Sequence, residues 1–517
     1  MATGTEEESP AIDDQTRQIA FLEDAATHKG ESIERVDTHG AILFLAGNTV
    51  YKLKRAVRFS FMDFSTCEKR RLACDAEVRL NRRTAPDLYL GTRPILERKG
   101  DLVFGEIGEK AADAIDWVVT MRRFDQAGLL DRQADEGRLK TETLTDLAAE
   151  IARFHDAEPA KGNEGVESIR TIIDGNLSDL DGFAAAETLK QLRNGCEALL
   201  TEWSPLIDRR VKAGCVRHCH GDLHLGNVCE IDSKPVLFDC IEFNEDFARI
   251  DTLYDLAFLL MDLDHRGHRD WANLVLNRYL DLRPVDAPGV ALLPLFLSMR
   301  AQIRAKVSYF AAQAQSHSDR AQSLLEAAGV FLDDALRYTR IEPPRLIAVG
   351  GASGSGKSTL ATALAPHIGA APGAVHLRSD VIRKRLWGSD FLACLPPEAY
   401  SGAMSRKTYG EMERLAEDTL REGASVIVDA TFTHKGSRKR IESISQTCGV
   451  AFTGLWLDAP QHKLEQRVTD RVGDPSDATA SVVRQQLAAN WGRIDWLRLD
   501  SGDGIEAILE KALQSLD

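Results

Sequence analysis

The first part of the chain carries short apolar and β-branched runs separated by turn residues. Residues 33–37 (IERVD), 41–46 (AILFLA) and 49–54 (TVYKLK) predict three strands of a small antiparallel meander. A helical stretch at 67–84 ends before a proline, and strand patterns return at 101–108 (DLVFGEIG) and 116–124 (DWVVTMRRF). From about residue 139 to 338 the pattern is mostly helical, interrupted at 234–243 (KPVLFDCIEF). We therefore expect an α+β domain with a strand-rich lobe at about 32–125 and a helical lobe at about 126–338.

A different pattern begins after the proline-containing stretch RIEPPR (340–345). The apolar run LIAVGG (346–351) leads into glycines and a helix, and the runs AVHLRSD (374–380), ASVIVDATF (424–432) and AFTGLWLD (451–458) follow between helical stretches. This alternation predicts an α/β fold with a parallel sheet of buried strands. The change of pattern predicts two domains, at 16–338 and 343–517, preceded by an acidic, disordered tail at 1–15.

The charge of the chain narrows the choice of partners. Its 517 residues carry a formal net charge of −15, so we expect neither nucleic acid nor a membrane surface as a partner. The nine cysteines include no CxxC pair, the polar N-terminus lacks a signal-peptide pattern, and the longest apolar run (290–299) is too short to span a bilayer. We expect a cytoplasmic protein with reduced thiols, and its oligomeric state stays open.

The stretch GGASGSGKST (350–359) contains the complete pattern G-x-x-x-x-G-K-[ST] between a strand pattern and a helical pattern. Glycines there let backbone N–H groups surround phosphates, and a helix N-terminus adds partial positive charge. We expect Lys357 to reach the β- and γ-phosphates of ATP and Ser358 to bind Mg²⁺. The expected ATP-binding residues of this loop are Gly351, Ala352, Ser353, Gly354, Ser355, Gly356, Lys357, Ser358 and Thr359.

Two aspartates at predicted strand ends accompany this loop. Asp429 ends the run VIVD and is expected to lie near Mg²⁺ as a Walker-B-like carboxylate. Asp380 ends the run LRSD, where it can accept the proton of a substrate hydroxyl; a helix N-cap is the alternative and compatible role. Arg467 and Arg471 are four residues apart on one predicted helix face and suit a lid that closes on phosphates, the alternative being a solvated face.

This second region resembles the small P-loop kinases of the gluconate kinase, polynucleotide kinase and zeta-toxin group. The resemblance rests on the phosphate-loop motif, on Asp380 with Arg383, on DAT (429–431) and on DRVGDPSDAT (470–479) with Arg471. In that group the early aspartate handles the substrate hydroxyl, which implies this role for Asp380. The group is broad in its substrates, so the resemblance names none.

The stretch VRHCHGDLHLGNV (216–228) allows two interpretations. Its histidines and cysteines are crowded, but zinc sites repeat a ligand pair at a distance, and no second pair is evident. Its core, HGDLHLGN (220–227), instead fits the kinase pattern H-x-D-x-x-x-x-N. In this pattern Asp222 would accept the proton of the substrate hydroxyl and Asn227 would bind Mg²⁺. Asp239 follows on the next strand pattern as a second Mg²⁺ ligand, with Glu242 as a possible helper.

A kinase site of this type also needs a lysine on a strand and a glutamate on a helix. The run TVYKLK offers Lys52 and Lys54 on the same strand face, and its match to V-x-I-K favours Lys52. Glu77 lies beside an inward-facing stripe of the helix pattern at 67–84 and is expected to hold this lysine, the alternative being a surface pair. The backbone near Met121 is expected to meet adenine. These parts occur in the order that a protein kinase requires.

The form H-G-D-x-H-x-x-N resembles the aminoglycoside phosphotransferase and choline kinase branch, over roughly residues 32–338. The resemblance implies a protein-kinase-like bilobal fold in which His220 shapes the loop and Asp255, within RIDTLYDLAFLLMDLD (249–264), supports it. The whole chain resembles bacterial fusions of such a domain with an AAA-type P-loop domain. It departs from the protein-kinase pattern in one respect, since no G-x-G-x-x-G loop precedes Lys52.

The sequence therefore predicts an ATP- and Mg²⁺-dependent phosphotransferase with two nucleotide sites. Its expected acceptors are hydroxyl groups of small molecules such as sugars, amino sugars or alcohols. One alternative is a regulatory protein in which the first domain is a degenerate kinase that senses a ligand while the P-loop domain hydrolyses ATP. Another is a toxin-like kinase. The missing glycine-rich loop favours the regulatory protein, whereas the intact Asp222, Asn227 and Asp239 favour the enzyme.

Overall fold

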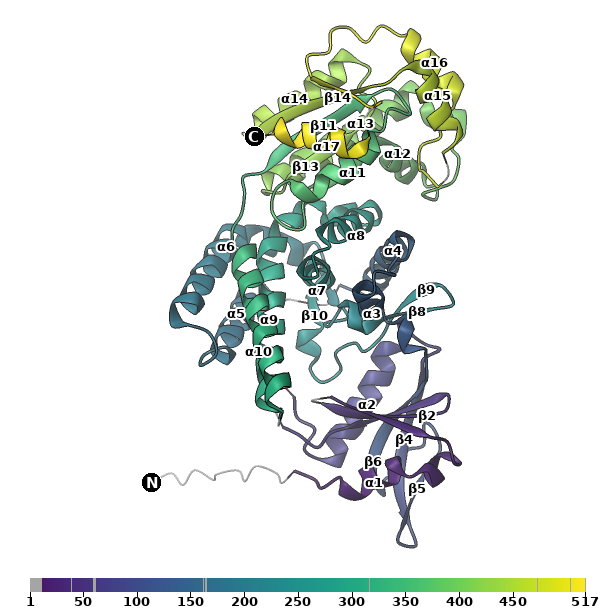
Figure 1. Ribbon diagram of the computed structural model, residues 1–517, viewed down its shortest axis with the longest axis vertical. Helices are drawn as coiled ribbons and strands as arrows, with labels where there is room; N and C mark the ends of the chain where they lie inside the picture. Colours follow the sequence, from purple (N-terminus) through teal and green to yellow (C-terminus); the bar gives the residue numbers. More distant parts are fainter. Residues whose placement is uncertain are drawn as a thin grey trace. The chain divides into compact units, whose positions relative to one another are not determined.

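The computed structural model describes residues 12–38, 40–58, 62–160, 162, 165–315, 317–471, 473–502 and 504–516. The chain forms two compact units (Figure 1). The first unit comprises Met1–Glu164 and Val216–Asp255, and the second comprises Gly165–Cys215 and Leu256–Asp517. Residues 1–11 of the predicted tail lie outside the described residues. Within the rest of that tail, Asp13 accepts a hydrogen bond from the Cys67 N–H (2.7 Å) and Gln15 donates one to Asp116 (2.8 Å), so order begins before residue 16.

A six-stranded sheet with antiparallel neighbours lies at the centre of the first unit, in the order β1-β2-β3-β6-β4-β5. Its strands are β1 (Ile33–Asp37), β2 (Ala41–Ala46), β3 (Thr49–Lys54), β4 (Tyr89–Arg98), β5 (Asp101–Phe104) and β6 (Ala114–Arg122). The predicted meander is confirmed at β1, β2 and β3. The sequence did not predict β4, because Gly91 and Pro94 break its strand pattern. In the structure the register shifts between Tyr89 and Gly91, and Pro94 lies opposite Trp117.

Helices cover both faces of this sheet. The helix α1 (Thr16–Glu23) packs Leu22 against Phe44 and Val118 on one face, and α2 (Cys67–Asn81) packs Val78 against Trp117 on the other. The remaining elements of the unit are η1 (Ala25–His28), η2 (Gln126–Gly128), α3 (Leu130–Asp135), α4 (Thr141–Ala157), β7 (Val216–His218), η3 (Leu225–Asn227), β8 (Val228–Ile231), β9 (Lys234–Leu237), η4 (Glu245–Phe247) and β10 (Arg249–Asp251). The helix α7 (Thr252–His265) follows β10 directly. β7 pairs with β10 and β8 with β9, and these short ladders hold the loops that carry the first candidate site.

The predicted parallel sheet of the second unit is confirmed, with five strands in the order β12-β13-β11-β14-β15. The strands are β11 (Arg345–Gly351), β12 (Val375–Arg378), β13 (Val426–Asp429), β14 (Ala451–Asp458) and β15 (Leu497–Asp500), the last of which the sequence did not predict. The accompanying helices are α11 (Lys357–Leu364), η6 (Ala365–His367), α12 (Ser379–Trp387), η7 (Pro397–Tyr400), α13 (Gly402–Arg421), α14 (Lys435–Cys448), α15 (Gln461–Thr469), α16 (Ala480–Ala488) and α17 (Ile505–Gln514). Apolar residues of β11, β13 and β14 pack against α11 and α17 to form its core.

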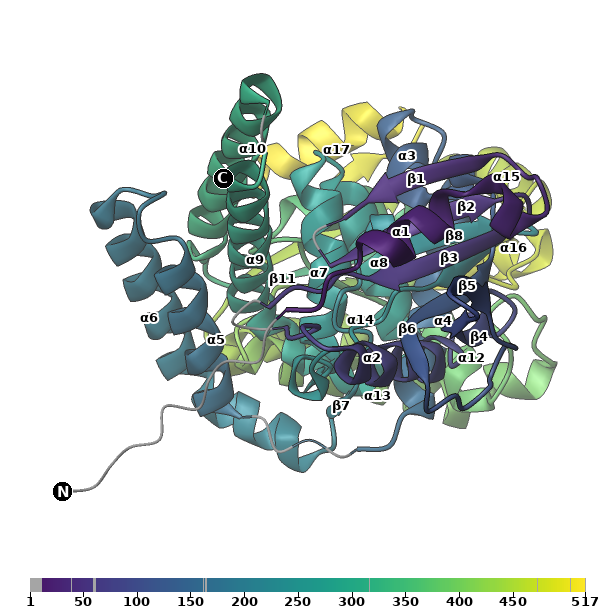
Figure 2. The same cartoon turned by 90° about the horizontal axis from the view of Figure 1, so that it is seen from below.

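A layer of helices belongs to the same unit as this sheet. It contains α5 (Val166–Asp179), α6 (Ala186–Lys212), α8 (Arg269–Leu282), η5 (Pro284–Leu292), α9 (Leu293–Gln313) and α10 (Ser318–Tyr338). Figures 1 and 2 show α9 and α10 side by side along most of their length. The apolar run 290–299 is buried there, as its pattern predicted.

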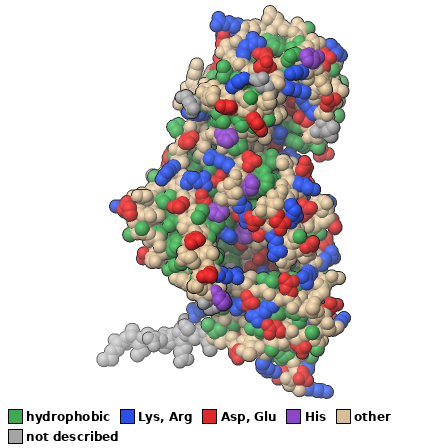
Figure 3. Space-filling view, viewed as in Figure 1, with side chains coloured by type: hydrophobic (Ala, Val, Ile, Leu, Met, Phe, Trp, Pro, Cys, Tyr) green, Lys and Arg blue, Asp and Glu red, His purple; other side chains and the backbone are tan. Residues whose placement is uncertain are grey.

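The surface carries both signs of charge. Figure 3 shows acidic and basic side chains intermixed over the face in view. Among the described helices, none is long and apolar enough to cross a bilayer.

Candidate active sites

The loop between β7 and β8 brings Asp222 and Asn227 together. The Asn227 Nδ2 donates to Asp222 Oδ2 at 2.8 Å and to the backbone oxygen of Asp222 at 2.9 Å. Gly221 has a φ of +85°, and a Cβ there would lie 3.0 Å from the Ile241 side chain, so this turn requires glycine. The Asp222 side chain is 38% exposed, which leaves it accessible to a substrate.

Asp255 lies directly beneath this loop, as the resemblance implied. Its carboxylate accepts the backbone N–H groups of His220 (3.1 Å) and Gly221 (2.8 Å). The His220 Nε2 lies 2.9 Å from the Phe238 oxygen, which ties the loop to the next hairpin, and burial lowers the pKa of His220. Sequence reasoning missed His155, whose Nε2 lies 3.1 Å from the same Asp255 carboxylate. The sequence pattern could have indicated it, because His155 is a polar residue on the apolar, buried face of α4.

His155, Cys219 and Asp255 form the one group of metal-type ligands found among the described residues, with ligand atoms within 4.8 Å of one another. Each ligand atom already has a hydrogen-bond partner: Asp255 binds the loop and His155, and the Cys219 Sγ lies 3.5 Å from the Ile250 oxygen. The geometry therefore favours a support for the catalytic-type loop over a zinc site.

Glu77 binds both candidate lysines of β3. The Lys52 Nζ lies 2.8 Å from Glu77 Oε1 and 2.5 Å from Asp239 Oδ1, whereas Lys54 forms ion pairs with Glu77 and Glu242. The Glu77 side chain is fully buried, so the alternative of a surface pair is wrong. Because only Lys52 contacts Asp239, the structure distinguishes two lysines that strand alternation could not.

The charges of this network change its pKa values. Burial alone would lower the pKa of Lys52, but the charges of Asp239 and Glu77 outweigh it and hold this pKa well above its ordinary value. Burial would raise the pKa of Asp239, and the charge and hydrogen bond of Lys52 instead lower it. Burial raises the pKa of Glu242 in spite of Lys54. Lys52 and Asp239 are therefore held in their charged forms.

Met121 lies near the end of β6, opposite Val50 of β3 and Tyr89 of β4. Its side chain is buried in the apolar cluster that includes Trp117. The contact of its backbone with adenine stays a prediction.

The second candidate site is a cavity of about 440 Å³ at the carboxyl end of the parallel sheet. The phosphate-loop residues Ser353, Gly354, Gly356, Lys357, Ser358 and Thr359 line it, together with Asp380, Arg383, Asp429 and Arg471. The loop begins at Gly351, where φ is +142° and a Cβ would lie 2.6 Å from the Leu457 oxygen. Only glycine allows this close approach of the backbone to β14. Six of the nine predicted phosphate-loop residues therefore line the cavity, and Gly351, Ala352 and Ser355 do not.

Asp429 and Ser358 meet at the base of the cavity. The Ser358 Oγ donates to Asp429 Oδ2 at 2.5 Å, and the His376 Nε2 lies 3.6 Å from the same oxygen. Burial would raise the pKa of Asp429, but the nearby His376 ring and the charge of Lys357 lower it. Burial lowers the pKa of Lys357, whose Nζ donates to the Ala352 oxygen at 3.0 Å. Sequence reasoning missed His376, which lies in the apolar run of β12.

Asp380 lies in the first turn of α12 and lines the cavity. The N-cap of this helix is Arg378, so Asp380 is not the N-cap residue. Burial raises the pKa of Asp380, with the nearby charge of Asp429 adding to the effect. A raised pKa suits a carboxylate that takes up a proton from a hydroxyl.

The predicted arginine lid needs a correction. The helix α15 ends at Thr469, so Arg467 and Arg471 do not share a helix face. Arg467 donates to the Ser501 backbone oxygen at 2.7 Å and to the Gly354 backbone oxygen of the phosphate loop at 3.4 Å, and it does not line the cavity. Arg471 lines the cavity and pairs with Asp474 at 3.4 Å. The helix pattern failed here because the chain leaves the helix at Asp470, before Gly473 with a φ of +69°.

Comparison with protein families assigns both regions. Residues 103–291 match the family described as "Phosphotransferase enzyme family", and residues 346–490 match the family described as "AAA domain". The protein is a kinase-type enzyme with one region similar to each of these families. The first match includes Asp222, Asn227 and Asp239 of this two-domain kinase, and the second includes Lys357 and Asp429.

Relatives that align with most of this chain exist in mycobacteria. Proteins of Mycobacterium tuberculosis and Mycobacterium bovis, each named as uncharacterized, are 29% identical to this kinase over 488 residues. The matches cover 91% of this chain and 91% of each relative.

Solved structures show weaker likenesses. A choline/ethanolamine kinase family protein from Mesorhizobium loti is 13% identical, covers 62% of this kinase and 97% of that chain, and has a TM-score of 0.38. A gluconokinase from Sinorhizobium meliloti is 21% identical, covers 34% of this kinase and 91% of that chain, and has a TM-score of 0.24.

Proposed function

We propose that this kinase transfers the γ-phosphate of ATP to hydroxyl groups of small molecules at two separate, Mg²⁺-dependent sites. The observation that carries the proposal is that each unit gathers three groups: a lysine, a carboxylate suited to Mg²⁺, and an aspartate that can accept the proton of a hydroxyl. In the first unit Lys52 binds Asp239 at 2.5 Å, and in the second Ser358 binds Asp429 at 2.5 Å close to Lys357. Phosphoryl transfer depends mainly on positioning and charge neutralisation, which such sets supply.

In the first site Asp222 would orient the acceptor hydroxyl and take up its proton. The Asn227 side-chain amide donates to the Asp222 carboxylate at 2.8 Å. The Phe238 N–H donates to the backbone oxygen of Asn227 at 3.0 Å, so Asn227 and Asp239 lie on adjoining segments. Their amide and carboxylate oxygens are ligands that Mg²⁺ prefers, and they would hold it. Bound Mg²⁺ would neutralise phosphate charge. Lys52, fixed by Glu77, would bind the phosphates of ATP.

In the second site the phosphate loop and Lys357 would bind the phosphates, and Ser358 with Asp429 would hold Mg²⁺. The hydroxyl and carboxylate oxygens form the hard donor set that this ion requires. Asp380 would accept the proton of the acceptor hydroxyl, and Arg471 would stabilise the phosphoryl group in transit. Asp380 is half-buried at the cavity, and its raised pKa supports this division of roles.

The test compares ADP release by the full-length wild type, Asp222→Asn and Lys357→Ala over a panel of sugars, amino sugars and alcohols. We expect each variant to lose one set of acceptor-dependent activities by at least about a hundredfold while keeping the other set. Unchanged activity of Asp222→Asn with every acceptor would refute the first site and leave the first unit as a ligand sensor. Full nucleotide affinity of the P-loop in Lys357→Ala would refute the second.

A further inference from the structure

We infer that helix α8 positions residues of the P-loop site. Its Asn277 and Asp281 are positioning residues that hold strand β12 in place. They thereby fix Arg378 and Asp380 for the reaction. This inference rests on the proposed function of that site. All of these residues belong to the second unit.

Strand β12 is an edge strand, and α8 occupies its open edge. On its other side β12 pairs with β13, from Val375 opposite Val426 to Arg378 opposite Asp429. The unpaired edge of a sheet carries N–H and C=O groups that need partners. In this protein those partners come from side chains of a helix rather than from another strand.

Two asparagines of α8 supply the hydrogen bonds. The Asn277 Oδ1 accepts the backbone N–H of His376 at 2.6 Å, and its Nδ2 donates to the Ala374 oxygen at 3.2 Å. Asn273, one helical turn earlier, donates to the same oxygen at 3.1 Å. An amide side chain that donates and accepts in this way replaces a neighbouring strand at one position of the edge. His376 is the residue whose ring approaches Asp429, so this contact is next to the Mg²⁺-type carboxylate.

A salt bridge continues the contact toward the cavity. Asp281, one turn after Asn277, accepts a hydrogen bond from Arg378 at 2.5 Å. The side chains of Asp281 and Arg378 are 9% and 21% exposed, and the Arg378 guanidinium lies 5.3 Å from the centre of the Phe391 ring. Such a partly buried, stacked pair fixes the arginine in one orientation. Arg378 lines the cavity two residues before Asp380, so Asp281 acts on the acceptor side of the site through Arg378.

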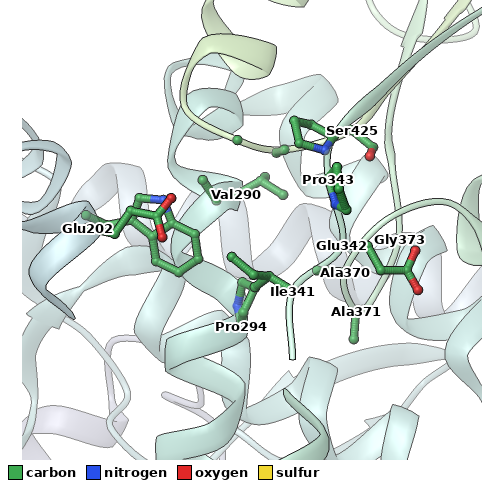
Figure 4. A pocket seen from close by; sticks show the side chains of 15 residues that line it. Glu202, Val290, Pro294, Ile341, Glu342, Pro343, Ala370, Ala371, Gly373 and Ser425 are labelled. Carbon is green, nitrogen blue, oxygen red and sulfur yellow. The ribbon is translucent and has the colours of Figure 1, made fainter. Parts of the chain in front are cut away.

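Elsewhere the helical layer is less closely packed against the P-loop region. A cavity of about 290 Å³ lies among α6, η5, α9, the connecting segment 341–344 and loops beside β12 and β13. Figure 4 shows Val290, Pro294, Ile341 and Pro343 around it. Its lining contains no candidate site residue. The hydrogen-bonded contact of α8 is therefore the part of this interface that reaches a strand bearing site residues.

The experiment uses the full-length chain carrying Asp222→Asn, so that the P-loop site is measured alone. The reaction contains Mg²⁺, ATP and one compound of the acceptor panel. A reaction without any of these compounds measures the transfer to water. We expect Asp281→Asn to slow ADP release by roughly tenfold to a hundredfold, because small displacements of a positioned group have effects of this size. The affinity for Mg²⁺-ATP should change by less than about twofold, since the phosphate loop keeps its contacts.

A matched control separates positioning from general damage. Asp270→Asn makes the same chemical change at an exposed residue in the first turn of α8, and it should leave the rate unchanged. Asp281 also lies 4.0 Å from Arg278 of the same helix, but its contact toward the cavity is Arg378. The double variant Asp281→Asn, Arg378→Gln should therefore be no slower than Arg378→Gln alone. Asp281→Glu should recover part of the rate. Hydrogen exchange in residues 375–387 should accelerate in Asn277→Ala and not in Asp270→Asn.

Two failures are distinguishable. ADP release that does not depend on Lys357 would overturn the proposed function and this inference with it. Lys357-dependent release at the parental rate in both Asp281→Asn and Asn277→Ala would overturn this inference alone. An additive double variant would show that Asp281 does not act through Arg378 and would overturn its positioning role.

Discussion

Lys52 and Lys54 share Glu77, but their removal would leave different carboxylates without a cation. Lys52→Met leaves Asp239, whose side chain is 38% exposed and can be rehydrated. Lys54→Met leaves Glu242, whose side chain is only 8% exposed. The side chain of Lys54, its partner, is 3% exposed. Glu77 keeps one lysine in either variant. The two substitutions therefore differ mainly in the burial of the carboxylate left behind.

This difference predicts opposite effects on stability and on nucleotide binding. Removing one partner of a buried ion pair costs about 3–5 kcal/mol, so Lys54→Met should lower the free energy of unfolding of the first unit by about that amount. A half-exposed carboxylate costs about 1 kcal/mol, which is the loss expected for Lys52→Met. Affinity for Mg²⁺-ATP should fall more in Lys52→Met, because Lys52 contacts the candidate Mg²⁺ ligand Asp239.

The change in stability of the first unit is measured by hydrogen exchange of the β6 peptide 114–122, because β6 pairs with β3, the strand that carries both lysines. A local probe is needed because the chain has two units, so one melting curve would not report on the first unit alone. Titration with a fluorescent ATP analogue measures the change in nucleotide affinity, in full-length protein carrying Lys357→Ala. The double variant Lys54→Met, Glu242→Met should recover most of the lost stability, since no buried charge remains unpaired. A larger loss of stability in Lys52→Met than in Lys54→Met, or no recovery in the double variant, would refute this account of the network.

Three further predictions concern separate parts of the chain. In Ser358→Ala, Mg²⁺ should no longer strengthen ATP binding at the P-loop, which calorimetry with and without Mg²⁺ checks; undiminished Mg²⁺ dependence would exclude Ser358 as a ligand. Because burial lowers the pKa of His220 from 6.5, the unfolded chain binds more protons below that pH, so stability should fall as pH drops below about 6.5. In His220→Gln the melting temperature should depend less on pH between pH 5 and 7.5 than in the wild type. The same pH dependence in both proteins would contradict the reasoning. Gly454→Ala should lower the free energy of unfolding by about 1–3 kcal/mol, since its Cβ would lie 2.3 Å from Trp496. The control Gly410→Ala, at an exposed position of helix α13, should raise it by about 0.5–1 kcal/mol. Equal melting temperatures of the two variants would refute the clash.

The second site was predictable because its chemistry is local in sequence. The phosphate loop needs a strand, a turn with glycines and a helix in succession, and all three lie within residues 345–364. The carboxyl ends of parallel strands then bring Asp429 to the same edge, which strand patterns alone imply. The order of the first-site residues was also predictable, because each lies in a recognisable motif.

The partners of these residues were not predictable, because they depend on contacts between distant segments. Strand alternation places Lys52 and Lys54 on one face, and only packing decides that Lys52 meets Asp239 and Lys54 meets Glu242. His155 lies 100 residues from Asp255, and its polar character gave no indication of which group it would bind. The prediction that Arg467 and Arg471 share a helix face was wrong for a related reason, since the sequence pattern did not reveal that the helix ends at Thr469, before Arg471.

The contact between α8 and β12 shows why a change of sequence pattern and a boundary of packing need not coincide. The strand-and-helix alternation begins near residue 345, and this change predicted a boundary there. The helical layer at Gly165–Cys215 and from Leu256 onward nevertheless belongs to one compact unit with the parallel sheet. An edge strand that carries site residues must satisfy its backbone groups somewhere, and here the nearest amide side chains are on α8. The first domain of the sequence therefore supplies structural groups to the site of the second, which gives a physical reason for the two to be joined in one chain.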